Sequence, residues 1–479
     1  MTFNKTIDFS NGDETGFSVI TINDGYILSG TGWGYEMDDY FDFKLKYVKI
    51  DLDGNIIWQK VVGDSATNYF CPPRSGELTN DNKIVLGITT QTLATSLISI
   101  LKFDPITGDT IFFRHFDYDD YMYANQIKEF TDGSLVILGW DSNDTFGSVL
   151  IKTTSEGNFV WDKRYGLGEA SASDFENKGK DTLYLLNNKV YCSPPGYWLR
   201  EIDSAGNESS NVHFTEDCPD FGLPSITGGF FGVGSYFPQP PYRSFIFRTD
   251  STGEILWHYD TTIDFDTLIY GQLFPAVVEE LPSGDIFVSG YFASNISGSY
   301  VGLVSKINLS GIPYWERFYT ANEDIYDDNR LHDMALTNDG GLIITGAAYS
   351  DNEIEDQNFW VLKLDSMGCL IPGCDTIGDA IMELPFEKAG ILIFPNPVKE
   401  EAIIQITFDS SPAINTLSFQ LTDILGKSVM ESEIGNSDLH IDGNKVRFSF
   451  HRKLIPAGIY LLNIYSNDIL IGSEKVILK

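Results

Sequence analysis

One pattern of apolar and polar positions recurs along residues 1–372 of the 479-residue chain. Each copy has an alternating apolar run and a glycine, and most copies add an acidic residue before that glycine and an aromatic residue four positions after it. Alternation with a period of two predicts β-strands, and glycine supplies the positive φ that tight turns need. The repeated glycines are Gly54, Gly108, Gly157, Gly206, Gly253, Gly311 and Gly368, at intervals of 54, 49, 49, 47, 58 and 57 residues.

A second phrase lies upstream in most copies, where a turn such as Asn23-Asp24-Gly25 precedes an apolar run. Dipeptides of the Asp-Gly type between alternating runs are strong hairpin signals. Each unit of about 50 residues therefore predicts four antiparallel strands, which is the content of one propeller blade. Seven units predict a seven-bladed β-propeller over residues 1–374. In the first unit we expect strands at Phe17–Ile22, Tyr26–Thr31, Leu45–Leu52 and Ile56–Val62.

The two ends of the repeated region predict how the ring closes. Most copies continue with an aromatic residue and a basic residue two positions later, as in Trp58 and Lys60. The seventh copy lacks this phrase, but Phe3-Asn4-Lys5 supplies it at the other end of the chain. We therefore expect a strand at Phe3–Ile7 to complete the last blade and leave no free sheet edge. The recurring Trp residues and their relatives are expected to pack between blades.

A linker at residues 375–390 is expected to separate the propeller from a smaller domain at residues 391–479. Seven short β runs in this domain predict a small immunoglobulin-like β-sandwich, so that the fold class is all-β throughout. The runs are Ile391–Phe394, Ala402–Phe408, Leu417–Thr422, Ser428–Ile434, Val446–Phe450, Ile459–Tyr465 and Ile469–Leu478.

Four ordered motifs in this domain resemble the type A C-terminal sorting domain of the type IX secretion system. They lie at 393–397 (IFPNP), 421–427 (LTDILGK), 456–460 (PAGIY) and 475–479 (KVILK). The resemblance implies that the outer-membrane export machinery reads the domain, which is commonly removed afterwards. It also implies that the protein crosses the periplasm and is secreted or held at the cell surface. The positions that carry the motifs are Pro395, Asn396, Pro397, Asp423, Gly426, Lys427, Gly458 and Tyr460.

Export by this route also implies an N-terminal signal. The first residues, Met1-Thr2-Phe3-Asn4-Lys5, lack the apolar stretch of a signal peptide. Because the chain begins inside a predicted blade, we expect the precursor to extend upstream of Met1.

The net charge of −36 is concentrated before residue 388. Residues 388–479 carry nine Lys/Arg and ten Asp/Glu, so almost the whole excess of acid lies in the predicted propeller. A field of that sign repels phosphate backbones and anionic lipid heads, which argues against nucleic acid and membrane surfaces as partners. No run of 18 apolar residues predicts a membrane-spanning helix.

Five cysteines occur, and none has the spacing of a zinc site. Cys369 and Cys374 enclose a short segment with a Pro-Gly pair, a plausible disulfide loop in an oxidising compartment. Cys192 and Cys218 are a candidate second pair, which leaves Cys71 free.

Blade topology predicts that one face of the propeller carries the long loops. A four-strand meander places its second turn and the link to the next blade on one face, and here these segments are long and variable. They mix carboxylates with aromatic rings, so we expect this face to bind a glycan, a peptide or a protein. The dense carboxylates are also a candidate Ca²⁺ site, and acidic loops that are merely solvated are the alternative. The candidate residues are Trp33, Tyr35, Asp38, Asp39, Tyr40, Asp119, Asp120, Trp140, Tyr236, Tyr242, Tyr291 and Tyr349.

No catalytic motif is recognisable. The six histidines have no metal-pair spacing, and no Gly-x-Ser-x-Gly elbow, phosphate loop or dinucleotide fingerprint occurs. We therefore assign no catalytic residue and no organic cofactor, and we favour a non-enzymatic binding propeller. A secreted enzyme acting on polysaccharide (a glycosidase or lyase) and a purely structural or adhesive surface protein remain open. The repeats also resemble the Trp-docking repeats of quinoprotein-type propellers, but those enzymes resemble eight-bladed rings with adjacent cysteines, which this sequence lacks.

Overall fold

The computed structural model describes residues 2–9, 12–34, 43–64, 66–118, 121–141, 147–165, 172–179, 181–188, 197–214, 221–226, 228–236, 243–251, 253–260, 272–293, 300–321, 328–349, 357–371, 390–407, 417–423, 428–434, 439–442, 445–453, 455–466 and 469–479. Within these ranges the regular elements are all β-strands, as the alternating pattern predicts. The chain divides into two compact units, Met1–Ala380 and Ile381–Lys479. The described residues contain no helix that is long and apolar enough to cross a membrane.

The described part of the first unit contains seven antiparallel sheets. Their strands follow one another in chain order, except that the second sheet has a split innermost strand and the last sheet borrows β1 from the start of the chain. The sheets comprise, in order, β2 (Gly12–Ile22), β3 (Gly25–Gly34), β4 (Lys44–Ile50) and β5 (Ile56–Val62); β6 (Asn68–Phe70), β7 (Gly76–Leu78), β8 (Ile84–Gln91), β9 (Ser96–Phe103) and β10 (Thr110–Phe116); β11 (Met122–Glu129), β12 (Leu135–Asp141), β13 (Ser148–Thr153) and β14 (Phe159–Tyr165); β15 (Ala172–Gly179), β16 (Thr182–Asn188), β17 (Tyr197–Asp203) and β18 (Glu208–Phe214); β19 (Phe221–Pro224), β20 (Phe230–Tyr236), β21 (Arg243–Thr249) and β22 (Ile255–Asp260); β23 (Gln272–Glu280), β24 (Ile286–Ala293), β25 (Tyr300–Ile307) and β26 (Pro313–Tyr319); and β27 (Asp328–Leu336), β28 (Leu342–Tyr349), β29 (Gln357–Leu364) and β1 (Phe3–Ile7).

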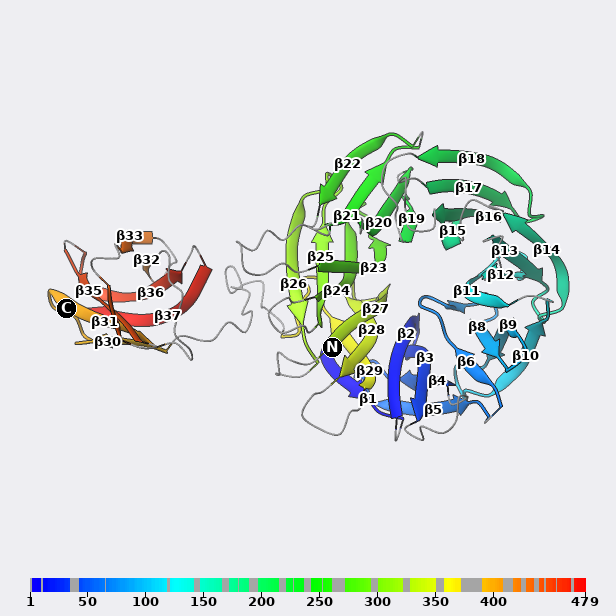
Figure 1. Ribbon diagram of the computed structural model, residues 1–479, viewed down its shortest axis with the longest axis horizontal. Coiled ribbons are helices and arrows are strands. Elements are labelled where there is room, and N and C mark those ends of the chain that lie inside the picture. The colour runs from blue at the N-terminus through cyan, green and yellow to red at the C-terminus, as the bar shows by residue number, and fades with distance from the viewer. Residues whose placement is uncertain are drawn as a thin grey trace. The chain divides into compact units, whose positions relative to one another are not determined.

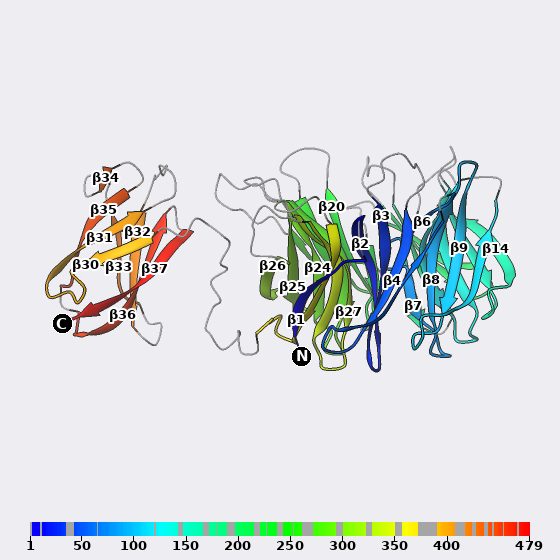
Figure 2. The same ribbon diagram turned by 90° about the horizontal axis from the view of Figure 1, so that it is seen from below.

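Neighbouring sheets pack in chain order, and that order closes on itself. Strand β2 contacts β7, β11 contacts β7 and β15, β19 contacts β15 and β23, and β27 contacts β23 and β2. The sheets of this unit therefore stand around a common axis with these strands innermost (Figure 1), and Figure 2 shows the same unit from the side. The apolar cores lie between neighbouring sheets, as with Ile100 of the second sheet and Ile137 of the third. This arrangement is a β-propeller.

The strand at the start of the chain closes the ring. Strand β1 pairs antiparallel with β29, with Phe3 opposite Lys363 and Ile7 opposite Phe359. The side chains of Phe3 and Ile7 are buried in a core shared with the first and last sheets. The predicted pairing of Phe3–Ile7 with the last repeat is therefore confirmed.

Three strand boundaries of the first sheet differ from the prediction by two residues or more. Strand β2 begins at Gly12 rather than Phe17, β3 ends at Gly34 rather than Thr31, and β4 ends at Ile50 rather than Leu52. The earlier end of β4 has a local cause. The Asp51 carboxylate accepts hydrogen bonds from the main-chain N–H groups of Asp53 (2.9 Å) and Asn55 (2.8 Å), which turns the chain before the run of apolar residues ends.

The repeated glycine and aromatic residues form the same joint between six pairs of neighbouring sheets in the described part of the chain. All seven glycines have positive φ, between 73° and 89°. A Cβ built on Gly108 would lie 3.0 Å from the ring of Trp58 in the preceding sheet, and one on Gly54 would lie 2.9 Å from the ring of Phe3. The same contact joins Phe112 to Gly157, Trp161 to Gly206, Trp257 to Gly311 and Trp315 to Gly368. The rings therefore pack between sheets, as predicted.

Replacing Gly311 by alanine is expected to destabilise the ring more than the same change at Gly340. Both glycines have similar φ (81° and 77°), so each alanine costs about 1–2 kcal/mol of backbone strain. At Gly311 the new Cβ also meets the Trp257 ring at 2.7 Å, whereas at Gly340 its nearest neighbour is 3.9 Å away. Overpacking adds about 1–3 kcal/mol. Urea unfolding followed by Trp fluorescence measures the difference, and equal losses at both positions would show that the ring contact contributes nothing.

The described part of the second unit contains two four-stranded sheets that share one apolar core. Ile404 and Phe448 of the first sheet pack in the same core as Leu421 and Ile464 of the second. The described strands number eight rather than the seven predicted, because the three residues of β34 are too few to show a pattern. The sheets are, in spatial order, β30 (Gly390–Phe394), β31 (Glu401–Thr407), β35 (Lys445–His451) and β34 (His440–Asp442), and β33 (Ser428–Ile434), β32 (Leu417–Asp423), β36 (Gly458–Ser466) and β37 (Ile469–Leu478).

Candidate functional site

The innermost strands of the ring carry a recurring irregularity. In five of the described sheets the innermost strand has one more residue than its neighbour between two successive paired positions, which is a β-bulge. Bulges re-aim side chains, and here they do so beside the ring axis. The shifts fall at Gly16/Ser18 of β2, Ala124/Ile127 of β11, Ala172/Asp174 of β15, Pro275/Val277 of β23 and Leu331/Asp333 of β27.

In the second sheet the innermost strand is interrupted, and Arg74 lies in the gap between β6 and β7. Arg74 has a φ of 57°, and its guanidinium pairs with Asp174 (2.8 Å) and with Glu176, both on the innermost strand of the fourth sheet. Lys128 of the third sheet pairs with Glu176 (3.0 Å) and Glu77 (3.7 Å). Charged groups of three sheets therefore meet at the axis as one ion-pair network, which we call the axial network.

Two carboxylates of this region also tie neighbouring sheets together through main-chain hydrogen bonds. Asp333 of the last sheet accepts from the N–H of Val19 in the first sheet (2.8 Å). Asp174 of the fourth sheet accepts from the N–H of Gly222 in the fifth (2.8 Å). These bonds satisfy N–H groups of β2 and β19, the innermost strands of their described sheets, each of which has a paired strand on one side only.

Burial sets the protonation of the acids near the axis. Burial raises the pKa of Glu279 from its ordinary value of 4.5 to about 8, although Arg74 opposes the shift. Burial likewise raises the pKa of Asp333 to about 6 and that of Asp174 above its usual range. Burial opposes the charge of Arg74 too, but Asp174 and Glu176 outweigh it and raise the pKa of the guanidinium. The cations are thus fixed in their charged form, while Glu279 is protonated at neutral pH.

The raised pKa of Glu279 predicts that the ring loses stability as the pH rises. Between pH 4.5 and about 8 the folded protein keeps a proton on Glu279 that the unfolded chain releases. The stabilisation that this proton gives is complete below pH 4.5, decreases as the pH rises, and is lost by about pH 8. The free energy of unfolding should fall by up to about 1.4 kcal/mol per pH unit for this group. Urea titrations at pH 6 and pH 8 should show a smaller difference in Glu279→Gln than in the wild type. Glu156→Gln is the control, because serine and threonine hydroxyls lower the pKa of that exposed carboxylate and it titrates below this window.

The described candidates for the ligand face gather at one end of the sheets, because each lies at or near the end of the second strand of its sheet. Trp33 lies in β3, Trp140 in β12, Tyr291 in β24 and Tyr349 at the end of β28, and all four side chains are partly exposed. Tyr236 ends β20 in the same way. The antiparallel pairing of every sheet runs in the same order, so these positions share one face. The remaining candidates, Tyr35, Asp38, Asp39, Tyr40, Asp119, Asp120 and Tyr242, lie outside the described residues.

Aromatic rings are paired on this face. Trp140 stacks on Tyr123 at the start of β11, with ring centroids 4.6 Å apart and an angle of 18° between the planes. Trp33 contacts Phe43, at 5.5 Å between centroids, just before β4. Such partly exposed pairs offer flat apolar surfaces that suit sugar rings and planar side chains.

A basic group joins the aromatic residues where the sixth and last sheets meet. The Arg330 guanidinium lies 4.2 Å from the ring centroid of Tyr300 and 5.9 Å from that of Tyr291. Tyr291 and Tyr300 pack edge to face, and the His332 ring lies 6.0 Å from Tyr291 and 5.0 Å from Phe17. Burial and the nearby Arg330 lower the pKa of His332 to about 3, so this imidazole is neutral. We call Tyr291, Tyr300, Arg330 and His332 the aromatic–arginine cluster.

The candidate Ca²⁺ site stays a prediction, since the acidic loop residues that suggested it lie outside the described ranges. Where the chain is described, no three His, Cys, Asp or Glu side chains are grouped as metal ligands. Among the cysteines, Cys71 is free and buried, as expected, and Cys369 is disulfide-bonded. Cys192, Cys218 and Cys374 lie outside the described residues.

The motif residues of the second unit are brought together by hydrogen bonds. The Asn396 side chain donates to the carbonyl oxygen of Lys475 (2.8 Å) and accepts from the N–H of Ile477 (2.9 Å), so it fastens the segment before β31 to the last strand. The main chain continues this contact, because the N–H of Val398 donates to Ile477 and that of Lys479 donates to Val398. The first and last of the four sequence motifs therefore form one structural element.

The other motif residues lie around the start of β36. The Tyr460 hydroxyl donates to the carbonyl oxygen of Pro456 (3.0 Å), and a Cβ on Gly458 would lie 3.2 Å from the Tyr460 ring. Asp423 is paired with Tyr460 between β32 and β36. Pro395 and Pro397 flank Asn396, and Gly426 and Lys427 lie outside the described residues.

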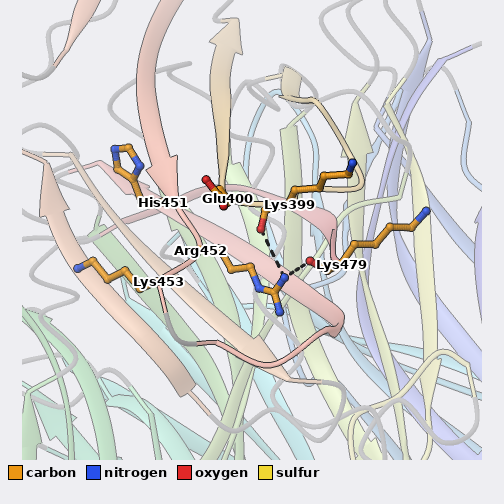
Figure 3. A pocket seen from close by; sticks show the side chains of 6 residues that line it. All are labelled: Lys399, Glu400, His451, Arg452, Lys453 and Lys479. Atoms are coloured by element: carbon orange, nitrogen blue, oxygen red, sulfur yellow. Dashed lines mark hydrogen bonds between the residues drawn. The ribbon is translucent and has the colours of Figure 1, made fainter.

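An open pocket of about 700 Å³ lies beside this junction (Figure 3). Arg452 stands at its centre, and its guanidinium donates to the main-chain oxygens of Ile455 (2.9 Å), Lys399 (3.4 Å) and Lys479. The main-chain N–H of Arg452 donates to the main-chain carbonyl oxygen of Glu400, and this bond ties the end of β35 to the start of β31. The lining residues are Lys399, Glu400, His451, Arg452, Lys453 and Lys479.

Two groups of residues were missed by sequence reasoning. The axial network joins Arg74 to residues about 100 positions away, and no motif or spacing links them. The only signal was the Pro-Pro-Arg stretch that interrupts the apolar pattern of the second repeat. The basic pocket carried a clearer signal, since His451-Arg452-Lys453 is a short run of basic residues in a chain with few.

Among known protein families, one matches the end of the chain. Residues 392–479 match the family model described as the secretion system C-terminal sorting domain, which confirms the resemblance of the four motifs. No curated protein matches the chain significantly.

Solved structures similar to the chain include several propellers. A protein from Lactobacillus plantarum is 10% identical, with a TM-score of 0.44 over 70% of this chain and 99% of that one. The Dos1 propeller is 12% identical, with a TM-score of 0.42 over 75% and 94%. The β-propeller domain of the Trilobed protease from Pyrococcus furiosus is 8% identical, with a TM-score of 0.42 over 73% and 97%.

Proposed function

We propose that this chain, which carries a type IX sorting domain and is secreted or held at the cell surface, is a non-enzymatic binding protein. Its seven sheets are the blades of a seven-bladed propeller, and its C-terminal unit is an immunoglobulin-like sandwich. The ligand is a glycan, a peptide or a protein that docks on the face formed by the ends of the second strands. The export machinery of the outer membrane is the partner of the sorting domain.

The observation that carries this proposal is the gathering of partly exposed aromatic rings on one face of the ring. Trp33, Trp140 and Tyr291 come from three different sheets, yet they share that face. Rings on a rigid scaffold bind without a large loss of conformational entropy, because few torsions are fixed on binding. The acidic charge of the unit adds a preference for basic or neutral ligands over anionic ones.

Glycan and protein arrays probed with the full chain, with and without Ca²⁺, test this function. We expect saturable binding to one ligand class, and at least tenfold weaker binding by Trp140→Ala and by Tyr291→Ala. Tyr314→Ala is the matched control, because Tyr314 is also exposed but lies near the start of β26, at the other end of the sheets. Loss of binding in the control alone, or no binding to any class, would contradict the proposal.

A polysaccharide-acting enzyme is the second candidate, and the acids near the axis favour it. Carboxyl groups whose pKa is raised by burial, such as Glu279 and Asp333, are typical of general acids. Asp174 and Glu176, in contrast, are engaged by Arg74 in ion pairs. Release of reducing ends from a polysaccharide panel by the wild type, and its loss in Glu279→Gln, would establish the enzyme and replace the binding function.

A further inference from the structure

We propose that the pocket around Arg452 in the C-terminal unit is a binding site for a phosphate group. The inference concerns a site that the ring's ligand face does not include, and it stands whether or not the ring binds a glycan. Four of the nine Lys/Arg residues of this region line the pocket with His451, against a single acid, Glu400. This concentration of positive charge is unusual in a chain with a net charge of −36.

Among the described residues, Lys399 and Lys479 lack the acidic partners that several lysines of the ring have. In the ring Lys46 pairs with Glu14, Lys102 with Asp81 (2.9 Å) and Lys363 with Asp339 (3.0 Å). Within the described ranges no ion pair involves the ammonium groups of Lys399 or Lys479. Their charge is therefore available to an anion from outside the chain.

The main chain fixes these two lysines beside each other. Val398 and Leu478 form a parallel bridge, so Lys399 and Lys479 are the next residues on two bridged segments. The N–H of Lys479 donates to the Val398 carbonyl oxygen at 2.9 Å. Figure 3 shows both side chains extending to the same side of Arg452, and both residues line the pocket.

The hydrogen bonds of Arg452 indicate whether the pocket suits a carboxylate or a phosphate. A carboxylate is best held by the two parallel N–H groups of an arginine. In this pocket Nε and Nη1 of Arg452 already donate to main-chain oxygens. Arg452 therefore has no pair of parallel N–H groups left to hold a carboxylate. The lysines remain as separate point charges with rotatable donors, which suit an anion that has three or four oxygens in different directions. Arg452 holds the walls of the pocket and Lys399 and Lys479 bind the anion.

Calorimetric titration of the full chain with inorganic phosphate tests the site. We expect saturable binding of one phosphate, and binding at least tenfold weaker in the double variant Lys399→Gln/Lys479→Gln. The control Lys445→Gln/Lys475→Gln removes the same charge from exposed positions of the same unit and should keep the affinity. Both variants keep the main-chain oxygens that Arg452 needs, and unchanged thermal melting without phosphate checks that they are folded.

The further arms of the experiment identify the source of the phosphate and the limits of the proposal. Mannose 6-phosphate and vesicles containing phosphatidylglycerol separate a sugar phosphate from a lipid headgroup. Acetate that binds as tightly as phosphate overturns the assignment of the anion. Equal affinity in the double variant and its control, or no saturable phosphate binding, overturns the site itself. Export of the variants from cells is measured separately, so failure of sorting is distinguished from failure of anion binding.

Discussion

Removal of Thr2–Phe9 is expected to open the ring and to cost the first unit most of its stability. The deletion removes the pairing of β1 with β29 and the buried side chains of Phe3, Ile7 and Phe9. Burial of each such side chain contributes about 1.5–3 kcal/mol, so the expected loss is roughly 5–9 kcal/mol. A loss of that size is comparable to the whole stability of a typical domain.

The same deletion uncovers the edge of β29, and a free edge pairs readily with another chain. Urea unfolding followed by Trp fluorescence measures the loss, and light scattering on a sizing column measures association. A synthetic peptide of residues 2–9 added in trans should restore the monomer and the unfolding midpoint, whereas a scrambled peptide should not. If the shortened chain kept its full stability, β1 would contribute nothing to the stability of the ring, and the other contacts would hold the ring together.

Replacing Arg74 by methionine is expected to destabilise the ring by about 3–5 kcal/mol, the usual result when one partner of a buried ion pair is removed. Asp174 would be left buried without its cation, and Glu176 would keep Lys128 as its cationic partner. The triple variant Arg74→Met/Asp174→Asn/Glu176→Gln should recover much of the loss, because it removes both carboxylates together with the guanidinium while Lys128 keeps Glu77 as its partner. Arg114→Met is the control, since Arg114 lies over the Phe112 ring in the outer strand of its sheet.

The destabilisation by Arg74→Met should also depend on pH. Without the guanidinium, burial raises the pKa of Asp174 further, and a protonated carboxyl is cheaper to bury than a carboxylate. The stabilising proton is bound at low pH and lost as the pH rises through the raised pKa. Equilibrium unfolding at pH 5 and pH 7.5 should therefore show a smaller loss at pH 5. If Arg74→Met lost the same free energy of unfolding at pH 5 and at pH 7.5, the loss would come from packing rather than from charge.

Much of the fold followed from positions that obey local rules. Gly54 and Gly311 repeat because a turn with positive φ needs glycine, and Trp58 and Trp257 repeat because each must pack on such a glycine. The turn requirement acts within a few residues, and the packing requirement links equivalent positions of neighbouring repeats, so both leave a period in the sequence. Phe3 could be assigned to the last sheet for the same reason, since it supplies the aromatic position that the seventh copy lacks.

The sorting motifs could be recognised in sequence, but the reason for their form is tertiary. Asn396 is needed because its amide bonds to Lys475 and Ile477, which are about 80 residues further along the chain. The pocket around Arg452 arises from the same junction. Only the fold brings Lys399 beside Lys479, so the short basic run at 451–453 alone did not reveal a site.

By itself the sequence determined the all-β class, the repeated joint between sheets, the closing strand and the sorting domain, because each depends on short-range patterns of glycine, aromatic and apolar residues. Only the tertiary structure decided where the charges meet. Arg74, Asp174 and Glu279 lie on three different sheets, and their ion pairs and raised pKa values follow from burial at a common axis. Burial and long-range proximity have no periodic signature, and that is why the axial network had to be seen in the fold.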